Sequence, residues 1–262
     1  MVNKQNKAIG IFDSGIGGSS IWKEINKLLP YENTIYLADS KNAPYGQKSK
    51  EKIVELSIKN TEYLLEQNCK LIVVACNTAT TNAIQYLRKT YKVPFIGIEP
   101  AIKPASISSK TRSIGILATK GTLNSQLFSK TANTLNNIII TEQIGTGLVE
   151  LIEEGKINSV EMDSLLKKHL SKFNDKNIDS LVLGCTHYPY LIPQIRKIIN
   201  SNISIIDSGF AVAKQTKNIL NIHNLTNTNK TKPNHFFYSN TNPEVFNKIL
   251  DNKDLNSKYL NF

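Results

Sequence analysis

Cysteine is scarce in this 262-residue sequence: there are three, and no two form a CxxC pair. An odd number without that spacing argues against a disulfide framework, so we expect reduced thiols. No apolar run approaches the roughly 18 residues that a membrane-spanning helix needs. The polar stretch at residues 1–7 also lacks the pattern of a signal peptide. These absences predict a globular protein of the cytoplasm that does not interact with membranes.

Histidine is also scarce, with four residues, and no set of His, Cys or carboxylate side chains has the spacing of metal ligands. We therefore expect no metal. The net charge is +11, but the lysines are scattered through Asn- and Ile-rich segments instead of forming one dense run. This pattern favours a solvated basic surface over a nucleic-acid interface, so no nucleic-acid partner is expected. Such a surface would attract anionic substrates.

Short apolar runs alternate with longer stretches of helical periodicity along the whole chain. This alternation is typical of parallel strands that crossover helices bury on both faces, and it predicts an α/β fold. Residues 49–68 illustrate the helical pattern, and the polar residues 223–235 predict a surface loop before a final strand and helix. The strand-like runs are AIGIF, TIYLA, KLIVVAC, FIGIE, SIGILAT, IIIT, SLVLGC and ISIID.

Two segments of the first half resemble two segments of the second half. AIGIFDSG resembles SIGILATKG at an offset of 105 residues (Ile9 to Ile114), and LIVVACNTAT resembles LVLGCTHYPY at an offset of 109 (Cys76 to Cys185). These nearly equal offsets predict a duplicated α/β unit. Related halves would place the two cysteines at equivalent strand ends on two sides of one cleft, where such folds bind ligands.

Each of these two cysteines ends an apolar strand and is followed by polar residues. Asn77 or Thr78 is suited to cap a helix that starts after Cys76, and a helix dipole there would lower the thiol pKa from about 8.5. Cys185 is followed by Thr186 and His187 in a similar arrangement. A lone Cys69 is more simply interpreted as a small buried hydrophobic residue.

Two thiols on opposite faces of a stereocentre suit a racemase. One base must remove the α-proton while the other delivers a proton from the far side. The site must also stabilise the developing carbanion, and the available donors are helix-start amides with Asn77, Thr78 and Thr186.

The glycine-rich loop after the first strand carries Asp13 and Ser14, which could meet a substrate ammonium or hydrogen-bond a catalytic thiol. An Asx-type turn is the plainer alternative for Asp13. A dinucleotide fingerprint is disfavoured because Ser20 replaces its third glycine. His187 is suited to shuttle a proton or tune the thiol two residues before it.

The segment after the second strand presents Tyr45 and Gly46. A tyrosine hydroxyl with a neighbouring backbone amide could hold a carboxylate, although PYG on its own is an ordinary turn.

The sequence resembles the glutamate racemases of the aspartate/glutamate racemase superfamily. The resemblance runs from about Ile9 to Asp207, and more loosely beyond. It implies two pseudo-symmetric α/β domains, residues 1–97 plus 207–262 and residues 98–206, with the active site between them. It also implies no pyridoxal phosphate or other cofactor and no metal. The motifs that carry it are DSGIGG (13–18), ADSKNAPYGQKS (38–49), ACNTAT (75–80), GIEPAIKPA (97–105) and GCTHYPYL (184–191).

The same resemblance implies an isomerase that interconverts L- and D-glutamate and supplies D-glutamate for bacterial peptidoglycan. Cys76 would take the proton of D-glutamate and Cys185 that of L-glutamate, assisted by Asp13 and His187. A homodimer is left open. Glu150 fits a carboxylate that some relatives place near the cleft, although the surrounding GTGLVELIEEG lacks the Cys-Pro segment of many members. The implied substrate contacts are Asp13, Ser14, Tyr45, Gly46, Asn77, Thr78, Thr186 and His187.

Two alternatives remain. An aspartate racemase would use the same cysteine pair, although aspartate-type members tend to carry an acidic residue where this chain has His187. A non-catalytic binding protein for an acidic amino acid could share the two-lobed cleft. Replacement of either cysteine by serine distinguishes a binding protein from a racemase. A racemase should lose turnover, whereas a binding protein should keep its ligand affinity and has no turnover to lose.

Overall fold

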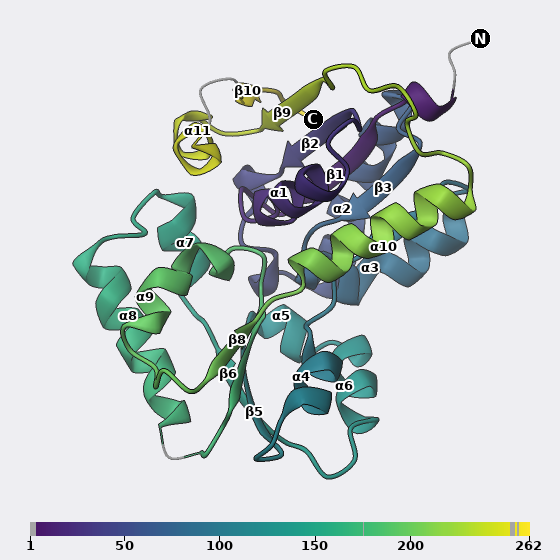
Figure 1. Ribbon diagram of the computed structural model, residues 1–262. Helices are drawn as coiled ribbons and strands as arrows, with labels where there is room; N and C mark the ends of the chain where they lie inside the picture. The colour runs from purple at the N-terminus through teal and green to yellow at the C-terminus, as the bar shows by residue number, and fades with distance from the viewer. Residues whose placement is uncertain (1–3, 175, 252–254, 256) are drawn as a thin grey trace.

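The computed structural model describes residues 4–174, 176–251, 255 and 257–262, and its strands form two parallel sheets (Figure 1). The six-stranded sheet has the order β10-β9-β2-β1-β3-β4, and the four-stranded sheet has the order β6-β5-β7-β8. The strands are β1 (Ile9–Asp13), β2 (Thr34–Ala38), β3 (Leu71–Val74), β4 (Phe95–Gly97), β5 (Ser113–Ala118), β6 (Ile139–Ile144), β7 (Ser180–Gly184), β8 (Ser204–Ile206), β9 (His235–Ser239) and β10 (Ser257–Tyr259).

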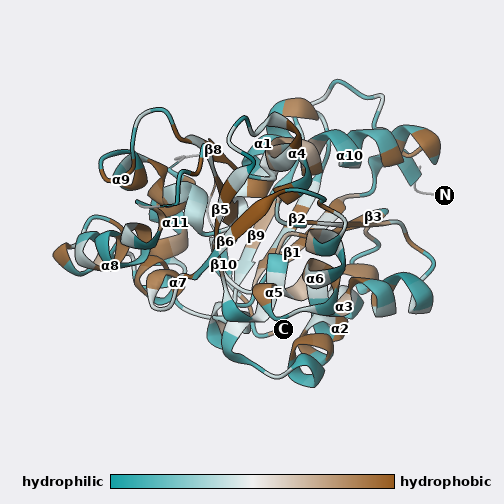
Figure 2. Cartoon of the chain, turned by 90° about the horizontal axis from the view of Figure 1, so that it is seen from below, coloured by the Kyte–Doolittle hydropathy of each residue, from teal (hydrophilic) through white to brown (hydrophobic). Residues whose placement is uncertain are grey.

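All eight strands expected from apolar runs are present, and the α/β fold is confirmed. Every residue of β1, β2, β3, β5 and β7 is buried, because helices cover both faces of each sheet. Figure 2 shows hydrophobic residues concentrated on these central strands. The strand expected after the polar loop is β9, whereas β10 was not predicted.

Helices connect the strands and enclose the sheets. The α-helices are α1 (Ser19–Leu28), α2 (Lys50–Glu66), α3 (Asn77–Thr90), α4 (Ile102–Ser108), α5 (Lys120–Leu123), α6 (Gln126–Asn133), α7 (Leu148–Glu153), α8 (Val160–Leu170), α9 (Ile192–Arg196), α10 (Gly209–Ile222) and α11 (Glu244–Leu250). The 3₁₀ turns are η1 (Lys4–Asn6), η2 (Ser40–Asn42), η3 (Tyr45–Gln47), η4 (Ser171–Phe173) and η5 (Tyr188–Leu191).

Helix α2 matches the predicted amphipathic segment. Ser49 is its N-cap, and its side chain accepts a hydrogen bond from the Lys52 amide at 3.3 Å. Ile53, Leu56 and Leu64 are buried on one face, as their spacing predicts.

The strand order supports the predicted duplication. β2-β1-β3-β4 and β6-β5-β7-β8 are the same arrangement, so β1 corresponds to β5 and β3 to β7. Cys76 follows shortly after β3 and Cys185 directly follows β7. The two cysteines therefore occupy equivalent positions in the two sheets.

The C-terminal segment returns to the six-stranded sheet. Helix α10 packs against α1, and β9 pairs with β2. This path is the one expected from about Asp207 onward, while the exact domain boundaries stay a prediction. Within the described residues, no helix is long and apolar enough to span a membrane.

Candidate active site

The two cysteines line one small cavity of about 10 Å³ at the carboxyl ends of β3 and β7. The side chains of Cys76 and Cys185 are almost fully buried, with 4% and 7% of their surface exposed. Nine of the ten predicted site residues line this cavity, and Asp13 is the exception. The remaining lining residues are Pro44, Thr119 and Val149. The sequence thus predicted which residues meet, and their individual roles stay predictions.

Cys76 is itself the N-cap of α3, in place of the expected Asn77 or Thr78. Its sulfur accepts a hydrogen bond from the Ala79 amide (3.4 Å), and its thiol donates to Ser14 Oγ (3.6 Å). Burial raises the pKa of Cys76 well above its usual value, and the charge of Asp13 raises it further. The predicted lowering of this pKa is wrong, because desolvation outweighs the helix-start amide. Cys76 therefore rests as a thiol.

Asp13 ends β1 and is fully buried beside this thiol. Its Oδ2 accepts a hydrogen bond from the Gly18 amide (2.8 Å), the loop contact of the plainer alternative, and its Oδ1 accepts one from Thr186 Oγ1 (3.4 Å). Burial raises the pKa of Asp13 to about 6, although the nearby His187 opposes the shift. Its carboxyl group can therefore gain and lose a proton near neutral pH.

We expect Asp13→Asn to stabilise the fold most at alkaline pH. Because the folded pKa of about 6 exceeds the value of 3.8 for a free carboxyl group, wild-type stability falls as pH rises from about 4 through 6. At 1.36 kcal/mol per pKa unit, the neutral amide should recover up to about 3 kcal/mol above that range. Urea unfolding at pH 5 and pH 8 measures this, and an equal gain at both pH values would contradict it.

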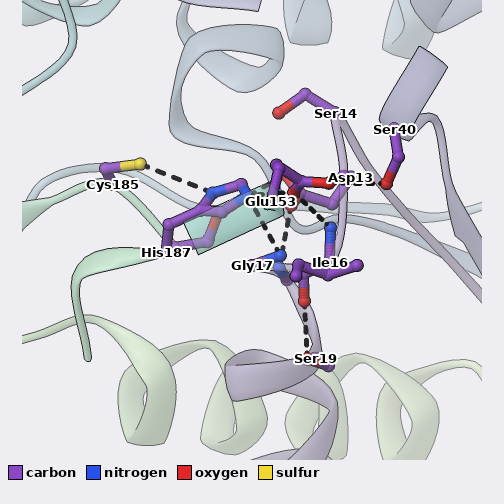
Figure 3. A network of polar contacts seen from close by, with 12 residues as sticks. Asp13, Ser14, Ile16, Gly17, Ser19, Ser40, Glu153, Cys185 and His187 are labelled. Carbon is purple, nitrogen blue, oxygen red and sulfur yellow. Dashed lines mark hydrogen bonds and ion pairs between the residues drawn. The ribbon is translucent and has the colours of Figure 1, made fainter. Parts of the chain in front are cut away.

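Cys185 belongs to a second chain of contacts (Figure 3). Its sulfur lies 3.7 Å from His187 Nδ1, and His187 Nε2 lies 2.5 Å from Glu153 Oε1. Glu153 also accepts hydrogen bonds from the Ile16 amide and from Ser40 Oγ, both at 2.7 Å. Three donors thus fix the carboxylate that orients His187. In contrast to Cys76, Cys185 does not cap an α-helix, because η5 starts three residues after it.

The charge state of His187 follows from these contacts. Burial alone lowers its pKa, but the hydrogen bonds with Cys185 and Glu153, and their charges, outweigh burial and raise the pKa well above 6.5. His187 is therefore protonated at neutral pH, and it places a positive charge beside the Cys185 sulfur.

The glycine-rich loop lets these side chains come close. A Cβ on Gly17 would lie 2.2 Å from His187 Nδ1, and one on Gly15 would lie 2.0 Å from Glu153 Oε1. The Gly17 amide also points at His187 Nε2, at 3.3 Å, so the ring has a donor within reach when that nitrogen is unprotonated. The glycines therefore allow the loop after β1 to contact the His187–Glu153 pair from the other sheet.

The carboxylate predicted near the cleft was Glu150, but the one that contacts His187 is Glu153. Glu150 lies one turn earlier on α7, and its Oε1 accepts a hydrogen bond from Gln47 Nε2 at 2.6 Å. The helical spacing of α7 could have indicated Glu153. Val149 is buried and lines the cavity, and Glu153 follows it by four residues, on the same side of the helix.

Tyr45 lies at the cavity, but its hydroxyl is already engaged. It donates to Asp39 Oδ2 (2.5 Å) and accepts from Asn60 Nδ2 (3.1 Å). The structure therefore gives no support to a substrate carboxylate held by this hydroxyl. Gly46 does border the cavity, and a Cβ there would meet the side chain of Thr119 at 2.7 Å.

Several polar groups face the cavity. Both side-chain polar atoms of Asn77 are buried and have no hydrogen-bond partner among the described residues. Thr78 Oγ1 lies 2.8 Å from Thr119 Oγ1 and 3.2 Å from Thr122 Oγ1. Thr119 was not predicted from the sequence, although the 105-residue offset places it opposite Ser14 in the repeat. No group of three or more His, Cys, Asp or Glu residues in the described part of the chain could hold a metal ion.

Comparison with known proteins agrees with this geometry. The family model for Asp/Glu/hydantoin racemases matches residues 9–216. A glutamate racemase of Ralstonia pickettii is 45% identical over 82% of this chain and 76% of its own length. One from Herpetosiphon aurantiacus is 40% identical over 94% of this chain and 97% of its own.

A solved structure is similar over almost the whole chain. The glutamate racemase of Francisella tularensis, solved in complex with D-glutamate, superposes with a TM-score of 0.85 at 32% identity and covers 98% of each chain. The protein described here belongs to the Asp/Glu/hydantoin racemase family, among its glutamate racemases.

Proposed function

We propose that this protein interconverts L- and D-glutamate with Cys76 and Cys185 as its two bases. The observation that carries the proposal is the pair of buried thiols at equivalent strand ends around one cavity. Bases on opposite faces of the α-carbon invert its configuration without releasing the carbanion. D-glutamate made in this way would serve peptidoglycan synthesis in the cytoplasm.

In the D-to-L direction, ionised Cys76 removes the α-proton while the Cys185 thiol delivers a proton to the opposite face. The reaction ends with Cys76 as a thiol and Cys185 as a thiolate, and L-glutamate reverses both transfers. A thiolate with a raised pKa is a stronger base, which suits a weakly acidic α-hydrogen. Asp13, with a pKa of about 6, is placed to take the Cys76 proton, and His187 is placed to exchange one with Cys185.

Substrate binding in this scheme uses the polar groups of the cavity. Asn77 offers an amide without a partner among the described residues, and Thr78, Thr119 and Thr186 offer hydroxyl groups. The bound D-glutamate in the Francisella tularensis structure supports the same substrate here. Buried donors aimed at the carboxylate would also stabilise the negative charge that develops as the α-proton leaves.

We expect Asn77→Ala to lower kcat/KM for glutamate by about 10- to 100-fold, because a hydrogen bond to a charged group contributes about 1.5–3 kcal/mol. Steady-state racemisation monitored by circular dichroism measures the loss. Asn133→Ala, at the exposed end of α6, is the matched control and should behave as wild type. A wild-type kcat/KM in Asn77→Ala would show that Asn77 does not bind the substrate.

The activity itself is tested with purified protein and L-glutamate or L-aspartate, following the decay of optical activity. We expect decay with glutamate and much slower decay with aspartate, which is one methylene shorter. A methylene contributes only about 1–3 kcal/mol to discrimination, so some aspartate turnover is compatible with the proposal. Faster decay with aspartate, or no decay with glutamate, would overturn it.

A further inference from the structure

A second and much larger cavity, of about 660 Å³, lies beside the active site. Residues from η3, α2 and α3 form one wall, and residues from α5 and α6 form the other. Figure 1 shows α3, α5 and α6 gathered where the two sheets approach each other. The proposed mechanism makes no use of this cavity.

The lining of this cavity is strongly basic. It contains Lys48, Lys50, Lys120 and Lys130 and no carboxylate. None of these four ammonium groups forms a hydrogen bond or ion pair with another described residue, whereas Lys52, Lys70 and Lys156 each pair with a glutamate. Four like charges around one hollow repel each other, and an anion placed among them relieves that repulsion.

We propose that this cavity binds a small polyanion of the phosphate class, with pyrophosphate as the simplest representative. Lysine is a common phosphate-binding residue because its ammonium acts as a mobile point charge. Amide side chains from Gln85 and Asn124 supply further donors around the cavity. Its volume of about 660 Å³ is within the range of small-molecule sites, so it has room for such a polyanion.

The position of the cavity gives such a ligand a structural effect. Lys48 and Lys50 come from the part of the chain that carries the six-stranded sheet, and Lys120 and Lys130 come from the part that carries the four-stranded sheet. A polyanion between them would hold the two walls together. The walls already touch at Asn82, whose Nδ2 donates to the Gly121 carbonyl at 3.2 Å.

The same contact lies next to the catalytic cavity. Gly46 borders both cavities, and a Cβ on Gly121 would lie 3.1 Å from the Gly46 Cα. An anion in the larger cavity would therefore lie beside Gly46, which also lines the active site.

Titration calorimetry of the full chain with inorganic pyrophosphate, at low ionic strength and without glutamate, tests the proposal. We expect saturable binding of one anion per chain. The double variant Lys50→Gln/Lys130→Gln removes one charge from each wall and should weaken binding at least about tenfold, because two short-range charge interactions are lost. Its kcat with glutamate, measured without pyrophosphate, should match wild type.

Lys168→Gln/Lys217→Gln is the matched control. It removes the same net charge from exposed positions on α8 and α10, outside the cavity, and should keep wild-type affinity. Equal weakening in both double variants would show attraction to the overall positive charge and overturn the proposal. No saturable binding to the wild type would overturn it as well. Because binding is measured without turnover, either result is independent of the racemase activity.

Discussion

Replacing Cys76 by serine will lower kcat for racemisation in both directions by about 10³-fold, because a hydroxyl group is a far weaker base than a thiolate at neutral pH. The rates in both directions fall, because Cys76 removes the α-proton of D-glutamate and delivers a proton when L-glutamate is converted to D-glutamate. Circular dichroism with L- and D-glutamate as separate substrates measures the two rates.

Cys69→Ala provides the matched control for this experiment. Cys69 is a buried thiol outside the catalytic cavity, and burial raises its pKa to about 12. Its replacement should leave kcat within a few-fold of wild type. Full activity in Cys76→Ser would exclude Cys76 as a base, and equal losses in the two variants would point to a general effect on folding.

Glu153→Gln should lower kcat by about 10²-fold, the smaller end of the range for acid–base assistance. The carboxylate is one of the groups that raise the pKa of His187, so its removal should lower that pKa. His187 would then lose its positive charge at a lower pH, and the alkaline limb of the kcat–pH profile should move to lower pH.

Glu150→Gln is the matched control, because it changes the same helix one turn away, at a carboxylate bound to the exposed Gln47. Its pH profile should coincide with that of the wild type. If Glu153→Gln lowers kcat without moving the profile, the role of Glu153 is to hold the loop after β1 through the Ile16 amide and the start of η2 through Ser40. If Glu150→Gln gives the larger loss, the assignment of Glu153 is wrong.

The strands and the proximity of the two cysteines could be predicted because both leave a recognisable pattern in the sequence. Strands buried on both faces are continuous apolar runs, and the internal repeat aligned Cys76 with Cys185. The repeat also pairs Ser14 with Thr119, so it could have predicted Thr119 as a residue of the cavity. Strand β10 gave no comparable signal, because it is short and two of its three residues are exposed.

The electrostatics of the site could not be predicted in the same way. The pKa of Cys76 depends on how deeply the folded chain buries it and on the charge of Asp13, which lies 63 positions earlier in the sequence. The pairing of Glu153 with His187 depends on how α7 approaches the loop after β1. The hydroxyl of Tyr45 was proposed to hold the substrate because the sequence does not show that the chain folds back to bring Asp39, six residues earlier, and Asn60 of α2 within hydrogen-bond distance of it.

The most direct test of the two-base mechanism is α-proton exchange in D₂O, followed by NMR for each serine variant with each enantiomer. With Cys185→Ser, the remaining Cys76 should exchange the α-proton of D-glutamate and not that of L-glutamate. Cys76→Ser should show the opposite preference, because Cys185 faces the other side of the α-carbon. Exchange of the same enantiomer by both variants, or of neither enantiomer by either variant, would contradict the assignment of one base to each face.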